Sequence, residues 1–257
     1  PPPTKLPTIP MRPHLTPETR EALLAGLREF AGPAREAGIP LETRVVEGDP
    51  VAVILGVARE LRADLIVLGT HGRGGFERWV LGSVTEKILR KAACPVLTVP
   101  PLAAGLAPED LPAFRHILCP VDFSEASLRA LEYAFSLAKE ADTRLSLMHS
   151  IESLPEEDPP ESLRFDSRAY RDYLRRVAGD RLLGLVPEGA RAWCHPEVVV
   201  ATGKAYREIL KVADERGAGL IVMGVHGRSP IDLMLFGSTT AHVARQAACP
   251  VLTIRSA

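Results

Sequence analysis

The sequence lacks any apolar run near the roughly 20 residues that a membrane-spanning helix needs. It also lacks a strong charge of either sign, because 31 basic residues stand against 32 acidic ones and the net charge is −1. Domains that bind nucleic acid usually carry a basic face or stripe, so this balance disfavours that class of function. With 46% hydrophobic and 25% charged residues, the composition is typical of a soluble globular protein.

Cysteine is scarce, asparagine is absent and Gln246 is the only glutamine. The four cysteines form no CxxC pair, and two of them, Cys94 and Cys249, precede the same Pro-Val-Leu-Thr segment. We therefore expect small buried core residues rather than metal ligands or disulfide partners, in a protein of the reducing cytoplasm. Arginine outnumbers lysine 25 to 6, which together with the missing amides is typical of a thermophilic source or of GC-rich coding.

Several catalytic motifs are missing as well. No GxxxxGK[ST] motif is present, so the lysine and the metal-binding hydroxyl of a P-loop are absent. No SGG-x-DS-type loop follows the apolar run that ends at Val121, no serine nucleophile elbow occurs, and no acidic pair stands out as a metal cage. These absences disfavour efficient phosphoryl transfer or hydrolysis.

A long internal repeat is the strongest positive signal. Val45–Val99 aligns with Val200–Ile254 without a gap at an offset of 155 residues, and 26 of the 55 aligned positions are identical. One duplication of this length indicates two copies of a domain rather than a solenoid. We expect a first module at residues 1–100, a linker rich in proline and small residues at 101–114, and a second module at 115–257.

The second module alternates strand and helix patterns. Apolar runs predict strands at His116–Val121, Leu145–His149, Glu197–Val200, Leu220–Met223 and Val251–Ile254. Amphipathic segments predict helices at Ser124–Glu140, capped by Ser124, and at Asp166–Leu185, Lys204–Arg216 and Ser238–Gln246. This alternation indicates an α/β fold with a doubly wound parallel sheet, covered on both faces. Ligands of such sheets bind beyond the carboxyl ends of the strands, where the strand order reverses.

Part of this pattern has no counterpart in the first module. At the same offset Pro1 aligns with Glu156, so nothing in the sequence corresponds to the two strands and the helix of His116–Ile151. A closed core would need them, and we expect about 35–45 further residues before Pro1 in the native protein.

A glycine pattern occurs at the same place in both copies. Gly69-Thr-His-Gly72, nine residues and Gly82-Ser83 recur as Gly224-Val-His-Gly227, nine residues and Gly237-Ser238, each between a Leu-Ile-Val strand and a predicted helix start. Glycines let backbone N–H groups approach phosphate oxygens, and a helix N-terminus adds donors and positive potential. The hydroxyls of Ser83, Ser238 and Thr239 add further donors. Glycines that only form turns are the alternative, but the double occurrence favours a polyanion site.

The spacing G-x2-G-x9-G-[ST], with Ile117–Ser124 (ILCPVDFS) and the closing Ala-Cys-Pro-Val-Leu-Thr, resembles the universal stress protein family over nearly the whole chain. The resemblance implies a five-stranded parallel sheet per module, flavodoxin-like in order and adenine nucleotide alpha-hydrolase-like. It also implies ATP at the switch point, with Asp122 and its neighbours near adenine and ribose, and Mg²⁺ as a companion of the triphosphate without an assigned ligand set. The candidate ATP-binding residues are Pro120, Val121, Asp122, Ser124, Met223, Gly224, His226, Gly227, Arg228, Gly237, Ser238 and Thr239, with Gly69, His71, Gly72, Arg73, Gly82 and Ser83 in the first copy.

Single residues in this set have plainer interpretations. Asp122 could be an acidic residue at a helix start, stabilised by the macrodipole. His71 and His226 could act as catalytic bases, although orienting the turn is the favoured role. Arg73 and Arg228 either reach a triphosphate or are solvated, and both alternatives stay open.

The closing strands, Val96–Val99 and Val251–Ile254, bear on assembly. In the family that the sequence resembles, the last strand lies at a sheet edge and pairs with its mate across a two-fold axis. An apolar edge needs cover, and a tandem can cover its two edges mutually. We therefore expect the modules to pair as an internal pseudo-dimer, which a further homo-oligomer could extend.

Three functions stay open. The favoured one is an ATP-binding, nucleotide-sensing module of the stress response with little or no catalysis. The second is a slow ATPase or another enzyme that uses an adenine nucleotide, such as an adenylyl-transferring pyrophosphatase. The third is a nucleotide-free interaction scaffold, against which the two intact glycine motifs count. No nucleic-acid or membrane partner is expected.

Overall fold

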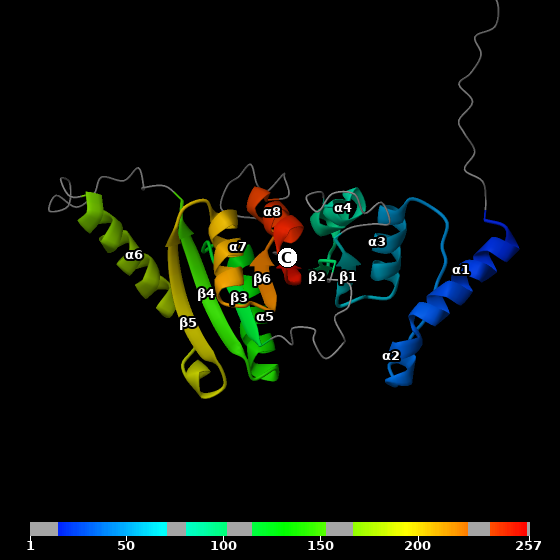
Figure 1. Ribbon diagram of the computed structural model, residues 1–257, viewed down its shortest axis with the longest axis horizontal. Coiled ribbons are helices and arrows are strands. Elements are labelled where there is room, and N and C mark those ends of the chain that lie inside the picture. Colours follow the sequence, from blue (N-terminus) through cyan, green and yellow to red (C-terminus); the bar gives the residue numbers. More distant parts are fainter. Residues whose placement is uncertain (1–14, 71–80, 102–114, 153–166, 226–236, 256–257) are drawn as a thin grey trace, which may run out of the picture. The chain divides into compact units, whose positions relative to one another are not determined.

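The computed structural model describes residues 15–70, 81–101, 115–152, 167–225 and 237–255 (Figure 1). The chain divides into two compact units, Pro1–Val57 and Ala58–Ala257. This division differs from the modules at residues 1–100 and 115–257 that the repeat predicts, and those module boundaries remain a prediction.

In the first unit the described elements are helical: α1 (Pro17–Phe30), α2 (Gly32–Glu36) and the start of α3 (Pro50–Glu60). Thr16 caps α1, because its hydroxyl accepts a hydrogen bond from the Thr19 amide over 3.2 Å. Arg20 of the same helix donates to the carbonyl of Val45 over 2.8 Å. This bond connects the segment before α3 to α1.

The second unit is built on one seven-stranded sheet (Figure 1). Its spatial order is β1-β2-β7-β6-β3-β4-β5, and the strands are β1 (Ile66–Gly69), β2 (Val96–Val99), β3 (His116–Pro120), β4 (Arg144–Ile151), β5 (His195–Thr202), β6 (Leu220–Gly224) and β7 (Val251–Ile254). Neighbouring strands are parallel except β2 and β7, which pair antiparallel with Leu97 opposite Leu252.

The predicted doubly wound α/β class is confirmed. In the second copy β4 and β5 lie on one side of β3, and β6 and β7 lie on the other, so the winding reverses between β3 and β6. The first strand of the copy is therefore central, as expected for a flavodoxin-like sheet. One detail differs, because the flavodoxin order places the third strand beside the first, whereas β5 lies outside β4 here.

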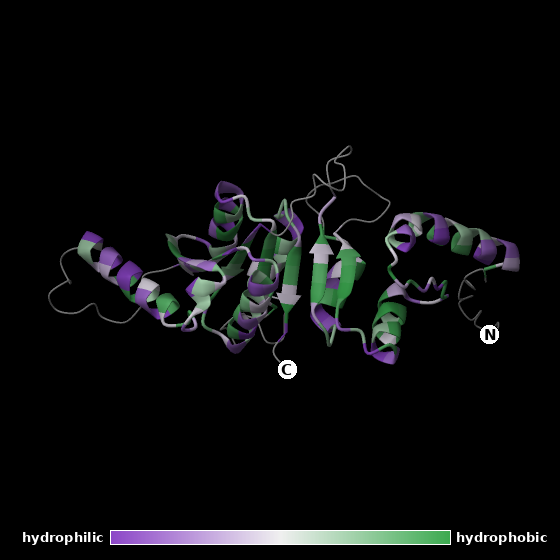
Figure 2. Cartoon of the chain, turned by 90° about the horizontal axis from the view of Figure 1, so that it is seen from below, coloured by the Kyte–Doolittle hydropathy of each residue, from purple (hydrophilic) through white to green (hydrophobic). Residues whose placement is uncertain are grey.

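Helices cover both faces of the sheet, and their bounds are α4 (Ser83–Lys91), α5 (Glu125–Glu140), α6 (Ser167–Leu183), α7 (Ala205–Glu215) and α8 (Ser238–Gln246), with a 3-10 turn at Ala190–Ala192. One core packs α5 and α6 against the sheet, and a second core packs α7 and α8 against the other face. Leu220 and Val222 of β6 belong to the first core, and Ile221 and Met223 belong to the second. A central strand buried on both faces is apolar along its length. Figure 2 shows hydrophobic residues in green on the strands of the sheet.

The elements of the second copy occupy the predicted places. α8 and β7 begin and end at the predicted residues, and Ser124 caps α5 as predicted. Leu131, Phe135 and Ala138 are buried on the predicted face of α5, and Leu128 is partly buried against the same core. Periodicity therefore located the helix and its buried side correctly.

Candidate functional site

Two strands of the second copy end side by side at the middle of the sheet. β3 and β6 are parallel neighbours, with Ile117 opposite Leu220. Their carboxyl ends therefore lie at the same edge, at the point where the winding reverses, which is where doubly wound sheets bind ligands. The segments at these ends, Val121–Ser124 and Gly224-Val225, hold several of the predicted site residues.

Asp122 lies in a tight turn between β3 and α5. Its Oδ1 atom accepts hydrogen bonds from the backbone amide of Ser124 over 2.9 Å and from the Ser124 hydroxyl over 2.5 Å. The Ser124 hydroxyl in turn accepts from the amide of Ser127 over 3.3 Å and so caps the helix. Asp122 is partly buried and is held at the start of α5, in agreement with the interpretation of Asp122 as an acidic residue at a helix start. Its participation in a ligand site remains a prediction.

Gly224 has a packing role that the sequence did not reveal. A Cβ atom at this position would lie 2.8 Å from the carbonyl carbon of Ala126 and 2.9 Å from the amide nitrogen of Ser127. The first turn of α5 therefore lies directly against the end of β6, and only glycine leaves room for it. The absence of a side chain at Gly224 allows α5 and β6 to pack closely, as one of the glycines in dinucleotide-binding folds allows a helix and a strand to do.

The N-terminus of α8 begins at the same edge. Gly237 precedes the helix, and Ser238 and Thr239 are its first residues. No side chain of the described residues caps this end, in contrast to α5. The unpaired N–H groups of the first turn and the helix dipole favour an anion here. The Ser238 side chain is exposed, and that of Thr239 is partly buried.

A threonine on the first turn of α8 ties this helix to the end of β6. The hydroxyl of Thr240 donates to the carbonyl of Gly224 over 2.9 Å and lies 3.4 Å from that of Val225. In the first copy the hydroxyl of Thr85 donates to the carbonyl of Gly69 over 3.1 Å. Thr85 and Thr240 occupy equivalent positions in the repeat, and the occurrence of threonine at both positions could have pointed to them. Neither was predicted as a site residue.

The first copy preserves the glycine-bearing side of the site. Gly82 precedes α4 and donates its amide to the carbonyl of Thr70 over 3.0 Å, and Ser83 is the exposed first residue of the helix. β1, which ends at Gly69, pairs only with β2 among the described strands. No described strand therefore lies beside β1 as β3 lies beside β6.

The remaining predicted residues fall into two groups. Val121 and Met223 are buried, with 2% and 4% of their surface exposed, and their side chains belong to the two cores; Pro120 is partly buried. The other group lies outside the described residues and comprises His71, Gly72, Arg73, His226, Gly227 and Arg228.

All four cysteines are free. Cys249 is buried, as predicted, and burial raises the pKa of its thiol to about 11; its counterpart Cys94 is only partly buried. Burial also raises the pKa of Cys119, which is fully enclosed in the core below α5. Thiols with a raised pKa are poor nucleophiles and metal ligands.

The described residues away from the switch point form a hollow but no candidate metal site. A hollow at the opposite, amino-terminal edge of the sheet is lined by Arg115, Thr143, Arg144, Cys194 and His195, among others. Within the described residues no group of three or more histidine, cysteine, aspartate or glutamate side chains is placed to hold a metal ion. No helix in the described ranges is long and apolar enough to cross a membrane.

Comparison with known proteins gives one consistent result. Residues 1–100 and 113–255 match the universal stress protein family. A universal stress protein of Mycobacterium tuberculosis is 28% identical over 232 residues, covering 89% of this chain and 72% of its own length. The universal stress protein YxiE of Bacillus subtilis is 31% identical over 147 residues, which are 55% of this chain and 99% of its own. The crystal structure of a universal stress protein from Archaeoglobus fulgidus aligns with a TM-score of 0.63 at 27% identity, covering 93% of this chain and 77% of its own.

Proposed function

The chain belongs to the universal stress protein family, and we propose that its second copy binds ATP at the carboxyl edge of β3 and β6. The observation that carries this proposal is the adjacency of two segments distant in sequence. The Asp122 turn follows β3. The start of α8, which no side chain of the described residues caps, follows β6 in the chain, and β3 and β6 are parallel neighbours. One side of the site therefore offers a fixed carboxylate, and the other offers backbone donors for an anion.

The two sides suit the two ends of a nucleotide. In the proposed complex the turn at Pro120–Ser124 holds adenine and ribose, because carboxylate oxygens accept hydrogen bonds from hydroxyl and amino groups. The amides and hydroxyls of Ser238 and Thr239 hold the phosphates, together with Gly237 and the loop residues 226–228. Mg²⁺ accompanies the triphosphate. We further propose a cytoplasmic location, which the four free cysteines support.

Little or no catalysis is part of the proposal. The sequence holds no P-loop lysine, and the described thiols are buried or have a raised pKa. We propose that the protein acts as a sensor: whether its site holds a nucleotide reports on the nucleotide state of the cell during stress. In the first copy the glycine-bearing strand end and the start of α4 are present, and Gly69, Gly82 and Ser83 are the proposed phosphate-side residues.

We also propose that the two copies pair as an internal pseudo-dimer, with modules at residues 1–100 and 115–257. The hydroxyl of Thr98 on β2 donates to the carbonyl of Val251 on β7 over 3.2 Å. The hydroxyl of Thr253 on β7 donates to the carbonyl of Val96 on β2 over 3.0 Å. The two donors, Thr98 and Thr253, occupy equivalent positions in the repeat, and so do the two acceptors, Val96 and Val251. The contact is therefore reciprocal, as a two-fold interface requires.

Ligand-dependent stability tests the ATP proposal. The full chain is melted alone and with ATP, ADP, AMP or cyclic AMP, with and without Mg²⁺. A ligand at 100 times its Kd should add about 2.7 kcal/mol of stability per site. No shift with any nucleotide would overturn the proposed ATP binding in favour of a scaffold. Turnover above about 1 s⁻¹ would instead overturn the proposed lack of catalysis, in favour of an enzyme.

Ser238→Glu locates the phosphate side. A carboxylate at the first position of α8 interacts favourably with the helix dipole. The melting temperature of the unliganded variant should therefore equal or slightly exceed that of wild type. The same charge repels a triphosphate, and ATP affinity should fall at least tenfold, while adenosine affinity changes little. Ser83→Glu is the matched variant in the first copy and reports whether that copy contributes. Unchanged ATP affinity in Ser238→Glu would remove α8 from the site.

A further inference from the structure

Phe123 adopts an unusual backbone conformation next to Asp122. Three non-glycine residues of the described chain have a positive φ: Arg62 at 49°, Asp142 at 46° and Phe123 at 65°. Arg62 and Asp142 follow the C-termini of α3 and α5, where a left-handed residue is common. Phe123 instead follows a strand, and an aromatic residue is strained in this region. Surrounding contacts must hold it there.

Among the residues that the structure describes, the side chains of His149 and Arg181 contact the Phe123 ring. The ring of His149 on β4 lies at a centroid distance of 4.9 Å, tilted by 47°. The guanidinium carbon of Arg181 on α6 lies 3.8 Å from the centroid of the Phe123 ring. His149 is itself anchored, because its Nδ1 atom lies 2.7 Å from the carbonyl of Val121. The ring is therefore held between a fixed imidazole of the sheet and a cation from a helix.

Arg181 is well suited to this contact. It is exposed, and no carboxylate in the part of the chain that the structure describes forms an ion pair with it. Its neighbour Asp180 pairs with Arg176 instead, at 3.9 Å. A guanidinium over an aromatic face is attracted by the ring quadrupole.

We infer that Arg181 is a positioning residue for the nucleotide. Phe123 lies between Asp122 and Ser124, whose hydrogen bonds define the turn, so the conformation of Phe123 sets where the Asp122 carboxylate points. Arg181 fixes that conformation from α6 without touching the ligand. This inference rests on the proposed function, since it assigns the Asp122 side of the site to adenine and ribose. Among the described residues, no ring or cation–π contact joins α8 to Phe123, His149 or Arg181; the ring contact of α8 is that of His242 with Tyr206.

Three ligands and two variants test the assignment. Calorimetry on the full chain compares wild type, Arg181→Met and Arg181→Lys with adenosine, ATP and inorganic tripolyphosphate. Methionine keeps an unbranched side chain about as long as the aliphatic stem of arginine but removes the charge, and lysine restores a cation. Arg181→Met should bind adenosine and ATP about two- to fivefold more weakly, the factor that an exposed cation–π contact provides, and should bind tripolyphosphate like wild type. Arg181→Lys should recover most of the loss.

A second readout needs no nucleotide. Exchange of the Ser124 amide proton, which is bonded to Asp122, should be about two- to fivefold faster in Arg181→Met and near the wild-type rate in Arg181→Lys. Equal adenosine affinity in Arg181→Met and wild type overturns the inference, as does an equal loss of tripolyphosphate binding. If wild type binds none of the three ligands, the proposed function fails, and unchanged Ser124 exchange in Arg181→Met would then overturn the positioning role by itself.

Discussion

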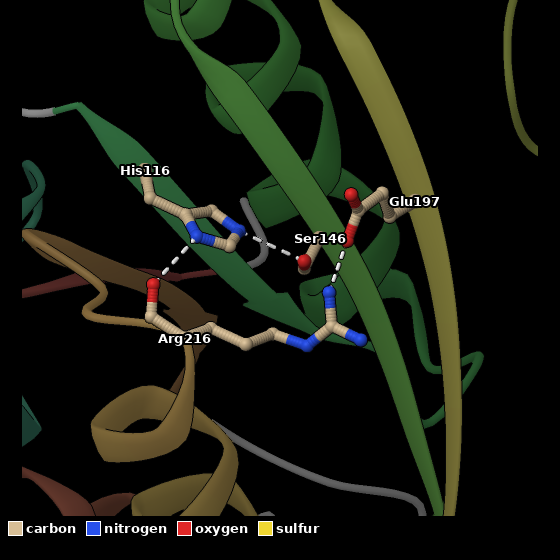
Figure 3. A network of polar contacts seen from close by, with 4 residues as sticks. All are labelled: His116, Ser146, Glu197 and Arg216. Atoms are coloured by element: carbon tan, nitrogen blue, oxygen red, sulfur yellow. Dashed lines mark hydrogen bonds and ion pairs between the residues drawn. The ribbon is translucent and has the colours of Figure 1, made fainter.

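The Nε2 atom of His116 lies 2.8 Å from the hydroxyl oxygen of Ser146, and both residues are buried at the amino-terminal ends of β3 and β4 (Figure 3). The Nδ1 atom of His116 lies 3.0 Å from the carbonyl oxygen of Arg216, which follows α7. A carbonyl can only accept, so Nδ1 carries the proton and Nε2 accepts from Ser146. The Arg216 guanidinium also pairs with Glu197 of β5, so the network joins three strands to the end of a helix.

This geometry predicts acid sensitivity. Burial lowers the pKa of His116 below its ordinary value of 6.5; Arg144 and Arg216 lower it further, whereas the bond to the Arg216 carbonyl and the charge of Glu197 raise it. The unfolded chain therefore takes up a proton at a higher pH than the folded chain does. The free energy of unfolding should fall as the pH drops below 6.5 and through the lower folded pKa, by at most about 1.4 kcal/mol per pH unit for one proton.

Urea unfolding between pH 8 and pH 5 measures this slope. His116→Gln should be less stable at every pH because it disturbs the buried bonds, but its slope below pH 6.5 should be shallower than that of wild type. His195→Gln, at an exposed position on β5, is the histidine variant measured for comparison. A slope unchanged by His116→Gln would show that other groups cause the acid sensitivity.

Gly224→Ala should destabilise the protein. The new Cβ atom would lie 2.8 Å from the backbone of Ala126, so α5 or β6 must shift, at a cost of about 1–3 kcal/mol. Gly56→Ala is the matched control, because nothing lies within 4 Å of a Cβ at that position in α3 and alanine is the better helix former. Chemical denaturation of both variants checks the pair. Equal stability of the two would mean that the contact with α5 adjusts without cost.

Thr98→Val and Thr253→Val should weaken the join between β2 and β7. Valine keeps the shape of the buried side chain but removes the hydroxyl, and each lost bond should cost about 1 kcal/mol. Because the two bonds are reciprocal, the single variants should cost similar amounts in denaturant unfolding. A cost confined to one variant would argue against the proposed two-fold relation.

Much of the fold follows from local patterns. The apolar run Leu220–Met223 and the capping serine Ser124 each depend on a few consecutive residues, so the strand and the helix start were predicted correctly. The repeat added the glycine pattern at equal places in both copies. Since all of these signals are carried by neighbouring or aligned residues, a single sequence contains them.

Other parts of the site depend on contacts between distant segments. Gly224 is a glycine because α5, which lies about a hundred residues earlier in the chain, packs against it. The contact of Arg181 with Phe123 likewise joins a helix and a turn from different elements. The place of β5 outside β4 has no periodic signal either, because a strand has the same pattern on either side of the sheet. Such features follow from tertiary packing and could not be predicted from the sequence.

The antiparallel pairing of β2 with β7 has a consequence for how the protein behaves at low abundance. Both strands belong to one chain, so their association is unimolecular, and its equilibrium is set by the tether between them and not by the amount of protein. Two separate single-module chains joined through the same strands would come apart on dilution. In this protein the equilibrium of the β2–β7 pairing is therefore independent of dilution.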